Sequence, residues 1–553
     1  MTSSAVDRED GRSLRSGFLR HAATAPDSAA LCIGSRTWSY GELDHRARVW
    51  AHALLDSLET RPSRVGILAY RSEVSYVGTL AALIAGATFV PLNPTFPSPR
   101  TEMMIDFADL DAIIVEQRYL DYLRDSLPAG YAPPLVLIPD GDEPAAGVGE
   151  RVLLGEQVNA FEPLSDPPAV LAFEIAYLLF TSGSTGVPKG VPVMHSNVLY
   201  FLDVMMERYG LGPGDRFSQT FDQSFDLSVF DLFLAWEAGA SVHVPSSIDL
   251  VAPTAFVNRQ ELSVWFSVPS IPALMRKKEL LRPDSLPTLR WSLFCGEALP
   301  RETAEAWQAA APNSTLENLY GPTELTIACF AYRWDPVSSP AECVNELVPI
   351  GRPYPGLGAI VLADDEGSTE EGEVGELLVC GPQTVPGYWR APEKTRERFL
   401  KLPATLATAE PESTFYSTGD RVVRHPSGRY AYLGRTDQQV KVRGGYRVEL
   451  GEIESVLRGF DGVVEAVAAG WPVEEGVIQG IVAFVSGAVL SDADILLQAR
   501  EQLPNYMVPA QVTIVERMPL NANGKIDRGA LVDQLAGEEQ AAAQGGGGPA
   551  DPS

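Results

Sequence analysis

The chain has 553 residues, of which 45% are hydrophobic and 21% charged, as in folded globular proteins and unlike disordered, collagen-like or coiled-coil chains. Acidic residues outnumber basic ones 72 to 43, and the net charge of −29 argues against nucleic acid or anionic membrane surfaces as partners. Five cysteines without a CxxC pair, and no signal-peptide pattern, argue against disulfides and zinc and favour the cytoplasm. The most apolar run, 77–92, is too short to span a bilayer.

The first 330 residues alternate apolar strands with helical patterns. Ser39 and Glu42 match a capping box ahead of apolar residues at helical spacing, which predicts a helix from Tyr40. Strand, helix and strand patterns follow at 64–70, 77–85 and 88–92. Further apolar strands are predicted at 111–115, 134–138, 174–181, 241–244 and 289–295. This order is typical of an α/β region with a parallel sheet.

From residue 349 the pattern changes to short strands separated by Gly, Pro and Asp turns. These strands are predicted at 358–362, 375–379, 420–424, 430–434 and 438–442. Helices at 450–459 and 493–503 and strands at 463–469 and 480–486 then predict a small α+β domain. The predicted organisation is a disordered N-terminus (1–14), a large N-terminal domain (15–436), a small C-terminal domain (437–535) and a disordered tail (536–553).

A polar, glycine-rich segment follows the buried strand that ends at Phe180. It reads TSGSTGVPKG over residues 181–190. Glycines allow backbone N–H groups to turn toward an anion, hydroxyls add donors and Lys189 adds a positive charge, a pattern that favours polyphosphate binding. The spacing of a P-loop NTPase, GxxxxGK[ST], does not occur. A flexible polar loop without a ligand is the alternative.

Further motifs follow in a fixed order along the chain. They are WSYGEL at 38–43, AGATFVPLNP at 85–94, FDLSVFD at 225–231, LYGPTE at 319–324, YSTGD at 416–420, GRTDQQVKVRG at 434–444, LPNYMVP at 503–509 and NGKIDR at 523–528. With these motifs, residues 15–535 resemble the adenylate-forming superfamily of acyl- and aminoacyl-activating enzymes, which includes adenylation domains of nonribosomal peptide synthetases. The resemblance implies a large α/β domain with a β-barrel-like subdomain, a small mobile α+β C-terminal domain, and ATP and Mg²⁺ as cofactors.

The resemblance also implies residue roles. Asp420 would bind the ribose hydroxyls, Glu324 the magnesium ion, Tyr320 the adenine and Arg435 the nucleotide. The implied nucleotide and phosphate set is Thr181, Ser182, Gly183, Ser184, Thr185, Gly186, Lys189, Gly296, Asn318, Tyr320, Gly321, Thr323, Asp420 and Arg435. Local sequence alone allows a turn aspartate at 420, a surface glutamate at 324 and structural roles for Tyr320 and Arg435.

Lys525 lies in a tight-turn sequence and by local reasoning is a solvated turn lysine. The resemblance instead implies a catalytic lysine that stabilises charge as the substrate carboxylate attacks the α-phosphate of ATP. Asp437 matches the hinge about which the small domain rotates between the two half-reactions. One departure is an extra residue at Gly444-Gly445, in the loop implied to line the pantetheine tunnel.

Asp226 occupies the place where aminoacyl-activating members pair a carboxylate with the substrate ammonium, although a helix N-cap aspartate is the alternative. The implied side-chain pocket consists of Leu227, Phe230, Ser267, Leu293, Cys295, Leu319, Ile327 and Ala328. It has no charged residue, and bulky walls above a small thiol leave room for about a methyl group. We therefore expect a small neutral α-amino acid: alanine first, with the L-form favoured, then glycine, serine, cysteine or 2-aminobutyrate.

Residues 293–300 and 225–231 resemble D-alanine:carrier-protein ligases in particular, and Cys295 matches a pocket cysteine of that subgroup. Leu319 departs from the smaller, more polar residue expected there. We therefore favour a stand-alone loader that delivers its amino acid to a discrete phosphopantetheinyl carrier protein in trans, in natural-product biosynthesis. The alternatives are a D-alanine ligase of teichoic acid modification, an acyl-CoA ligase, and a non-catalytic sensor.

Overall fold

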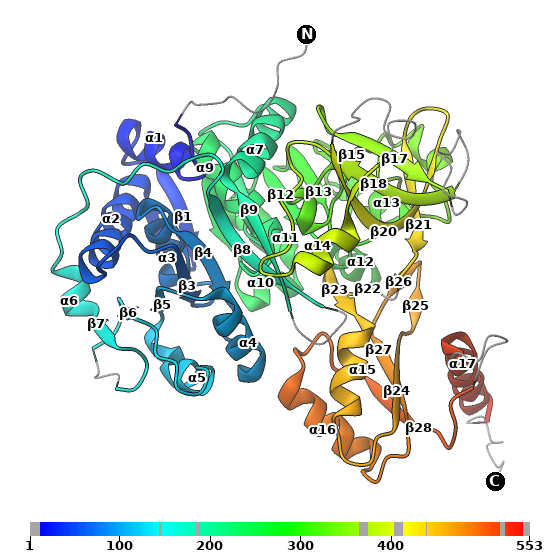
Figure 1. Ribbon diagram of the computed structural model, residues 1–553. Coiled ribbons are helices and arrows are strands. Elements are labelled where there is room, and N and C mark those ends of the chain that lie inside the picture. Colours follow the sequence, from blue (N-terminus) through cyan, green and yellow to red (C-terminus); the bar gives the residue numbers. More distant parts are fainter. Residues whose placement is uncertain are drawn as a thin grey trace, which may run out of the picture. The chain divides into compact units, whose positions relative to one another are not determined.

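The computed structural model describes residues 11–142, 146–183, 188–363, 374–402, 413–437, 439–519 and 526–545. Contacts within the chain divide it into two compact units. The first consists of Met1–Thr181 and Pro188–Asp437, and the second of Ser182–Val187 and Gln438–Ser553. Figure 1 shows the elements of both units in sequence colours.

A seven-stranded sheet with the order β7-β6-β5-β3-β4-β8-β9 lies in the first unit. Its strands are β3 (Arg64–Leu68), β4 (Thr88–Leu92), β5 (Ala112–Val115), β6 (Leu135–Ile138), β7 (Arg151–Leu154), β8 (Ile175–Thr181) and β9 (Lys189–Met194). The predicted parallel pairing is confirmed for β3, β4, β5, β6 and β8. Strands β7 and β9 were not predicted: β7 pairs parallel with β6, and β9 runs antiparallel to β8. The chain reverses after β8, so that Thr181 pairs with Lys189.

A nine-stranded sheet has the order β16-β15-β14-β13-β12-β10-β11-β1-β2. Its strands are β1 (Ala29–Ile33), β2 (Arg36–Ser39), β10 (Arg216–Ser218), β11 (Ser241–Val244), β12 (Val264–Ser267), β13 (Trp291–Phe294), β14 (Thr315–Tyr320), β15 (Phe330–Arg333) and β16 (Arg352–Pro353). The interior pairs are parallel and the pairs at both edges are antiparallel. The C-terminal ends of β12, β13 and β14 therefore lie side by side.

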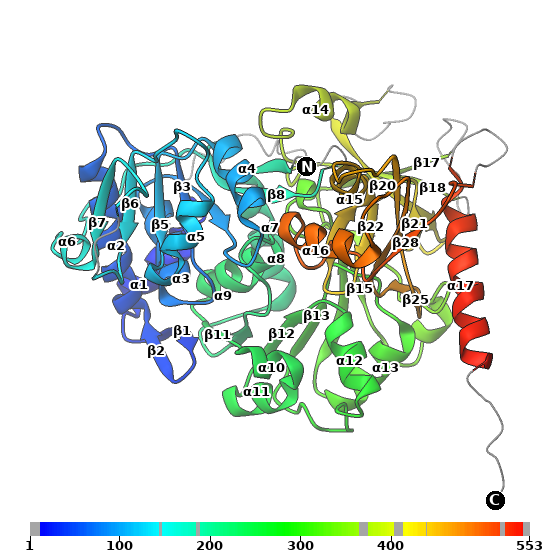
Figure 2. The ribbon, with the colours of Figure 1, turned by 90° about the horizontal axis from the view of Figure 1, so that it is seen from below.

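Helices α2 (Tyr40–Ser57) and α3 (Glu73–Ile84) lie between β1 and the seven-stranded sheet (Figures 1 and 2). The predicted capping box of α2 is confirmed: the Ser39 hydroxyl accepts from the Glu42 N–H, and the Glu42 carboxylate accepts from the Ser39 N–H. Every residue of α3 after its first is buried, because apolar layers cover it on several sides.

Other helices cover the remaining faces of these sheets. They are α1 (Ser16–Thr24), α4 (Ser98–Ala108), α5 (Leu120–Asp125), α6 (Gly155–Asn159), α7 (His195–Tyr209), α10 (Ser247–Val251), α11 (Pro253–Gln260), α12 (Ser270–Lys277) and α13 (Arg301–Ala310). Trp265 and Phe294 pack with α11 to α13, whereas Phe266 and Leu293 face the central core. Since side chains alternate along a strand, this register points Leu293 inward, whereas Ser267 lies on the same face of β12 as Trp265.

The region predicted as a β-barrel-like subdomain forms a five-stranded antiparallel sheet. Its elements are β17 (Gly358–Leu362), β18 (Val374–Cys380), α14 (Pro392–Arg398), β19 (Phe399–Lys401), β20 (Thr414–Arg424) and β21 (Tyr430–Arg435). Strand β20 is longer than predicted and contains the whole YSTGD motif, so Asp420 lies inside a strand.

The second unit contains two small sheets, with the orders β23-β22-β26-β25 and β24-β27-β28. Its elements are β22 (Gln439–Val442), β23 (Tyr446–Glu449), α15 (Leu450–Arg458), β24 (Glu465–Gly470), β25 (Val473–Glu474), β26 (Val477–Ile478), β27 (Ile481–Ser486), α16 (Asp492–Gln502), β28 (Gln511–Ile514) and α17 (Arg528–Gly545). The extra glycine forms part of the β22–β23 turn, where Gly444 and Gly445 both have positive φ, at 98° and 76°.

Both predicted disordered ends differ from the structure in part. The side chain of Leu14 is buried in the hydrophobic core. The backbone N–H of Leu14 also donates to His195 Nδ1 at 3.0 Å. Helix α17 continues to Gly545, and the alanine-rich sequence from 536 explains this, since alanine has the highest helix propensity. No helix in the described part of the chain is both long and apolar enough to cross a membrane.

Candidate active site

Asp226 is a buried carboxylate at the start of α8 (Leu227–Val229), which continues into a π-helix at Phe230–Leu234 and α9 (Ala235–Ala238). Its Oδ2 accepts from the Ile327 N–H at 3.1 Å, and it also accepts from the Thr323 hydroxyl. Burial, with a smaller effect of the Glu324 carboxylate, raises the pKa of Asp226 to about 7. Asp226 is the N-cap residue of α8, as the alternative expected, but its side chain makes no capping hydrogen bond.

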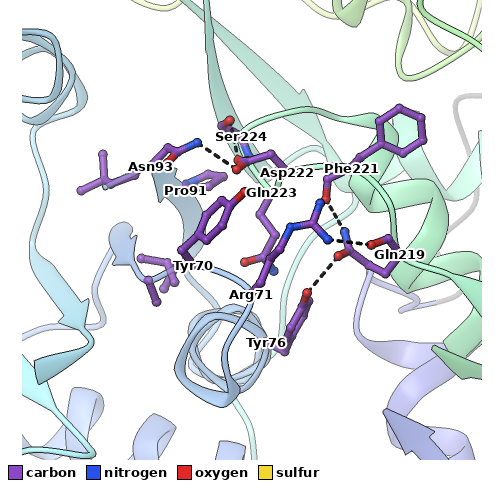
Figure 3. A pocket seen from close by; sticks show the side chains of 13 residues that line it. Tyr70, Arg71, Tyr76, Pro91, Asn93, Gln219, Phe221, Asp222, Gln223 and Ser224 are labelled. Carbon is purple, nitrogen blue, oxygen red and sulfur yellow. Dashed lines mark hydrogen bonds between the residues drawn. The ribbon is translucent and has the colours of Figure 1, made fainter. Parts of the chain in front are cut away.

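The loop before Asp226 is held by polar side chains from α3 and from the loops that follow β3 and β4 (Figure 3). Tyr76 donates to Gln219 Oε1 at 2.9 Å, and the Asn93 amide donates to Asp222 Oδ2 at 2.8 Å. Arg71 donates to the Gln219 carbonyl at 3.2 Å. The cavity that these groups line has a volume of about 10 Å³, enough for about one water molecule and too small for an amino acid.

All eight implied pocket residues are buried, and all of them except Ser267 belong to the central hydrophobic cluster of the first unit. Ser267 is the polar member, and its hydroxyl is already satisfied: it accepts from Trp265 Nε1 at 3.0 Å and donates to the Val268 carbonyl at 3.2 Å. The Phe230 ring packs on Phe266 with centroids 4.4 Å apart. These side chains offer a substrate mainly apolar surface.

The YGPTE segment turns sharply after β14. A Cβ atom on Gly321 would lie 2.5 Å from Ala328 Cα, so this position requires glycine. Glu324 lies in a 3₁₀ turn at Thr323–Leu325 and is fully buried, so the surface-glutamate alternative is wrong. The Tyr388 hydroxyl donates to Glu324 Oε1 at 2.8 Å.

Glu324 is compatible with magnesium, because a Mg²⁺ ion at a nucleotide site takes one or two carboxylates and completes its shell with phosphate and water oxygens. No group of three or more His, Cys, Asp or Glu side chains suited to a metal occurs among the residues that the structure describes. A single buried carboxylate therefore fits a magnesium ion that arrives with the phosphates.

Asp420 and Arg435 form a buried ion pair, and Arg435 links it to the partly exposed Asp437. Asp420 Oδ2 accepts from the Tyr320 hydroxyl and Asp420 Oδ1 from Arg435 at 2.6 Å. Arg435 also contacts both oxygens of Asp437 at 2.7 and 2.8 Å, and Arg398 donates to Asp437 Oδ2 at 2.9 Å. The turn-aspartate alternative is wrong, and because each carboxylate oxygen has two lone pairs, Asp420 retains acceptor capacity for hydroxyl groups.

We predict that Arg435→Met lowers the stability of the first unit by about 3 kcal/mol, because it leaves the buried Asp420 carboxylate without its cation. Arg435 and Asp420 side chains are only 7% and 3% exposed. The melting temperature measures the effect, and Arg424→Met, an exposed arginine of the same sheet, is the matched control. Equal melting temperatures for the two variants would contradict the prediction.

The remaining implied nucleotide residues are only partly described. Asn318 donates to the Pro349 carbonyl at 2.9 Å, while its Oδ1 is buried and has no hydrogen-bond partner in the described structure. Gly296 follows β13 with a φ of 97°, and Lys189 starts β9 with its ammonium 5.7 Å from the centroid of Tyr388. Ser182 and Gly183 group with the second unit. The predictions for Ser184, Thr185, Gly186 and Lys525 lie outside the described residues.

Sequence reasoning missed Tyr388 and Gln383, which lie beside the YGPTE turn but follow it by about 60 residues. Neither belongs to a motif recognised above. The PGY sequence at 386–388 is an available signal for a tight turn that presents an aromatic side chain.

Two protein-family models match this chain and show the family to which it belongs. Residues 18–389 match the family described as AMP-binding enzyme, and residues 452–525 match the AMP-binding enzyme C-terminal domain. The chain belongs to the AMP-binding enzyme family. This membership places it among the AMP-forming adenylating ligases, with the α/β fold and small C-terminal domain that the sequence predicted.

Relatives of this AMP-binding enzyme include the L-proline--[L-prolyl-carrier protein] ligase of Pseudomonas fluorescens, 33% identical over 95% of this chain and 99% of that protein. The chain spans only 6% of the nonribosomal peptide synthetase CymA of Salinispora arenicola, at 34% identity. Among solved structures, the Vibrio cholerae adenylation domain AlmE with glycyl-adenosine-5'-phosphate is 31% identical, with a TM-score of 0.82 over 95% of this chain and 98% of that one. IdnL7 is 39% identical, with a TM-score of 0.71 over 95% and 99% of the two chains.

These comparisons leave one prediction unsupported. The relatives matched along nearly their whole length include a proline ligase and AlmE, and they do not support the particular likeness to D-alanine:carrier-protein ligases. That likeness was inferred from residues 293–300 and 225–231, which lie at the end of β13 and around α8. Leu319, the residue that departed from the subgroup, is buried in the central hydrophobic cluster.

Proposed function

We propose that this enzyme activates a small neutral α-amino acid with ATP, releases pyrophosphate, and transfers the aminoacyl group to a separate phosphopantetheinyl carrier protein in natural-product biosynthesis. Alanine is the first candidate, with the L-form favoured, followed by glycine, serine, cysteine and 2-aminobutyrate. The named relatives support the amino-acid class, since one is a proline ligase and another was solved with glycyl-adenosine-5'-phosphate.

The observation that carries the proposal is the environment of Asp226. This carboxylate is buried near the apolar side chains of the implied pocket, and it forms no ion pair with a Lys, Arg or His among the described residues. A buried carboxylate is unfavourable unless a cation or hydrogen bonds compensate it. The ammonium group of an α-amino acid supplies such a cation, whereas a simple carboxylic acid does not.

The pocket walls support a small, uncharged side chain. Ser267 is internally hydrogen-bonded, and its neighbours are aliphatic, aromatic or thiol groups. A charged or strongly polar substrate side chain would lose its water without gaining partners there. Hydrophobic pockets discriminate by about 1–3 kcal/mol for each methylene, so we expect activity with several small amino acids.

For the nucleotide, Asp420 would accept the ribose hydroxyls, Tyr320 would contact the adenine and Asn318 Oδ1 would accept from the adenine amino group. The orphaned Oδ1 is the observation that supports this placement. Glu324 would hold Mg²⁺, which when bound neutralises phosphate charge. An oxygen of the amino-acid carboxylate then attacks the α-phosphorus, the bond to the bridging β-phosphate oxygen breaks, and pyrophosphate leaves.

Lys189 and the hydroxyls of 181–185 would bind phosphate oxygens, and Lys525 would stabilise the charge that develops on the reacting phosphate. Asp437 would act as the hinge for the second half-reaction. Its position at the end of the first unit and its pairing with Arg435 support this role. In that half-reaction the carrier thiol sulfur attacks the aminoacyl carbonyl carbon and AMP leaves.

Exchange of labelled pyrophosphate into ATP tests the proposal. The panel contains both alanine enantiomers, glycine, serine, cysteine, valine and simple carboxylic acids. We expect the strongest exchange with L-alanine or another small neutral amino acid. Exchange with D-alanine above all would indicate the opposite configuration, and exchange with carboxylic acids but not amino acids would contradict the assignment of Asp226.

A further inference from the structure

Two residues of the YGPTE turn have an unfavourable backbone conformation. Thr326 and Ile327 have φ angles of 57° and 71°. Both are β-branched, and such residues are genuine outliers in the left-handed region because the Cβ atom crowds the backbone. This conformation persists only when surrounding contacts hold it.

The strained backbone matters because it positions the amino-acid site. The Ile327 N–H points at Asp226 and donates to Oδ2 at 3.1 Å. This bond lowers the pKa of Asp226, opposing the effect of burial, and so favours the ionised carboxylate. A relaxed turn would move this donor away from the carboxylate that we assign to the substrate ammonium.

Gln383 provides the contacts that hold the turn. Its side chain is fully buried and comes from the loop after β18, 55 to 58 residues further along the chain. Its Nε2 lies 3.0, 3.1 and 2.7 Å from the carbonyl oxygens of Leu325, Thr326 and Ala328. Only the amide nitrogen can face three carbonyl oxygens favourably, because it donates and they accept. The Thr326 hydroxyl donates to the backbone carbonyl oxygen of Gln383 at 2.6 Å.

Glu324 is held by different contacts. Its carbonyl accepts from the Val385 N–H at 3.0 Å and its carboxylate from the Tyr388 hydroxyl at 2.8 Å. The side chain of Gln383 takes part in neither bond. Removing the Gln383 amide should therefore disturb Ile327 and Asp226 more than the proposed magnesium ligand.

We propose that Gln383 is a positioning residue for amino-acid recognition: its side-chain amide holds the left-handed turn at Thr326 and Ile327 and so aims the Ile327 N–H at Asp226. This inference rests on the proposed role of Asp226. It assigns a specificity function to a glutamine that contacts neither the nucleotide-binding residues nor the pocket side chains through its amide.

The test replaces Gln383 with methionine, which has a similar length and no donor, and with asparagine, which keeps the amide but is one methylene shorter. We expect Gln383→Met to raise KM for the best amino acid of the exchange panel about 10-fold, while KM for ATP changes less than about 2-fold. Gln383→Asn should show the same selective effect. Thr384→Val is the matched control, since the Thr384 hydroxyl is buried without a hydrogen-bond partner in the described structure and we expect no change.

An unchanged KM for the amino acid in Gln383→Met would overturn the proposal. Equal losses for ATP and amino acid, or loss of folded protein in both variants, would also overturn it, because they would indicate a general scaffold role. Asp226→Asn, measured in parallel, separates this inference from the proposed function. If Asp226→Asn keeps amino-acid recognition, the proposed function and the role of Gln383 are both contradicted. If Asp226→Asn loses recognition while Gln383→Met keeps it, only the role of Gln383 is contradicted.

Discussion

Asp226→Asn is expected to raise KM for the amino acid about 100-fold and to leave KM for ATP within about 2-fold. The substitution keeps the size of the side chain and removes its charge, so the substrate ammonium would enter a buried site without a counter-ion. Hydrogen bonds to charged groups contribute about 1.5–3 kcal/mol, which corresponds to roughly 10- to 150-fold in affinity. Pyrophosphate exchange at varied amino-acid and ATP concentrations measures both constants.

Asp222→Asn is the control for this variant, because Asp222 lies in the same loop but bonds to Asn93 and Ser224 instead of facing the pocket. We expect its amino-acid KM to stay close to that of the unmodified enzyme. Equal effects of the two substitutions would indicate a loop defect and would contradict the assignment of Asp226 to the ammonium.

The same carboxylate predicts a pH dependence. Burial raises the pKa of Asp226 to about 7, so below pH 7 the free enzyme increasingly carries the neutral acid, which cannot pair with an ammonium. We expect kcat/KM for the amino acid to fall by up to about 10-fold per pH unit below pH 7 and to level off above it. In Asp226→Asn, kcat/KM for the amino acid should no longer fall below pH 7. If kcat/KM still falls below pH 7 in this variant, another group is responsible for the titration.

Lys525→Ala is expected to lower kcat for pyrophosphate exchange by about 10²–10³ while the Kd for ATP stays within about 2-fold. The proposed lysine acts on charge that develops in the transition state, and removal of one such group typically has an effect of this size. Equilibrium binding of ATP and steady-state exchange separate the two contributions. Lys401→Ala, at an exposed lysine, is the control, and near-normal exchange in Lys525→Ala would refute the assigned role.

The sequence by itself determined the elements whose signals are local. The capping box at Ser39 and Glu42 begins α2, and hydrophobic runs mark β3, β4, β5, β6 and β8 of the seven-stranded sheet. The motifs also indicated the family and placed Asp226, Glu324 and Asp420 among the candidate site residues. The local elements and the family could be predicted because the relevant information lies within a few neighbouring residues, or within short patterns that occur together in one order.

Other features were decided only by the tertiary structure. Strand β9 reverses against β8, Leu14 is ordered through His195, and Gln383 holds a turn that precedes it by more than 50 residues. No local pattern predicts Thr326 and Ile327 in the left-handed region, since β-branched residues disfavour it. Contacts between distant residues offset the local backbone preference at this turn, and sequence neighbours carry no information about such contacts. The motifs therefore placed the candidate site residues, whereas the contacts of Gln383 that aim the Ile327 N–H at Asp226 could be identified only in the folded chain.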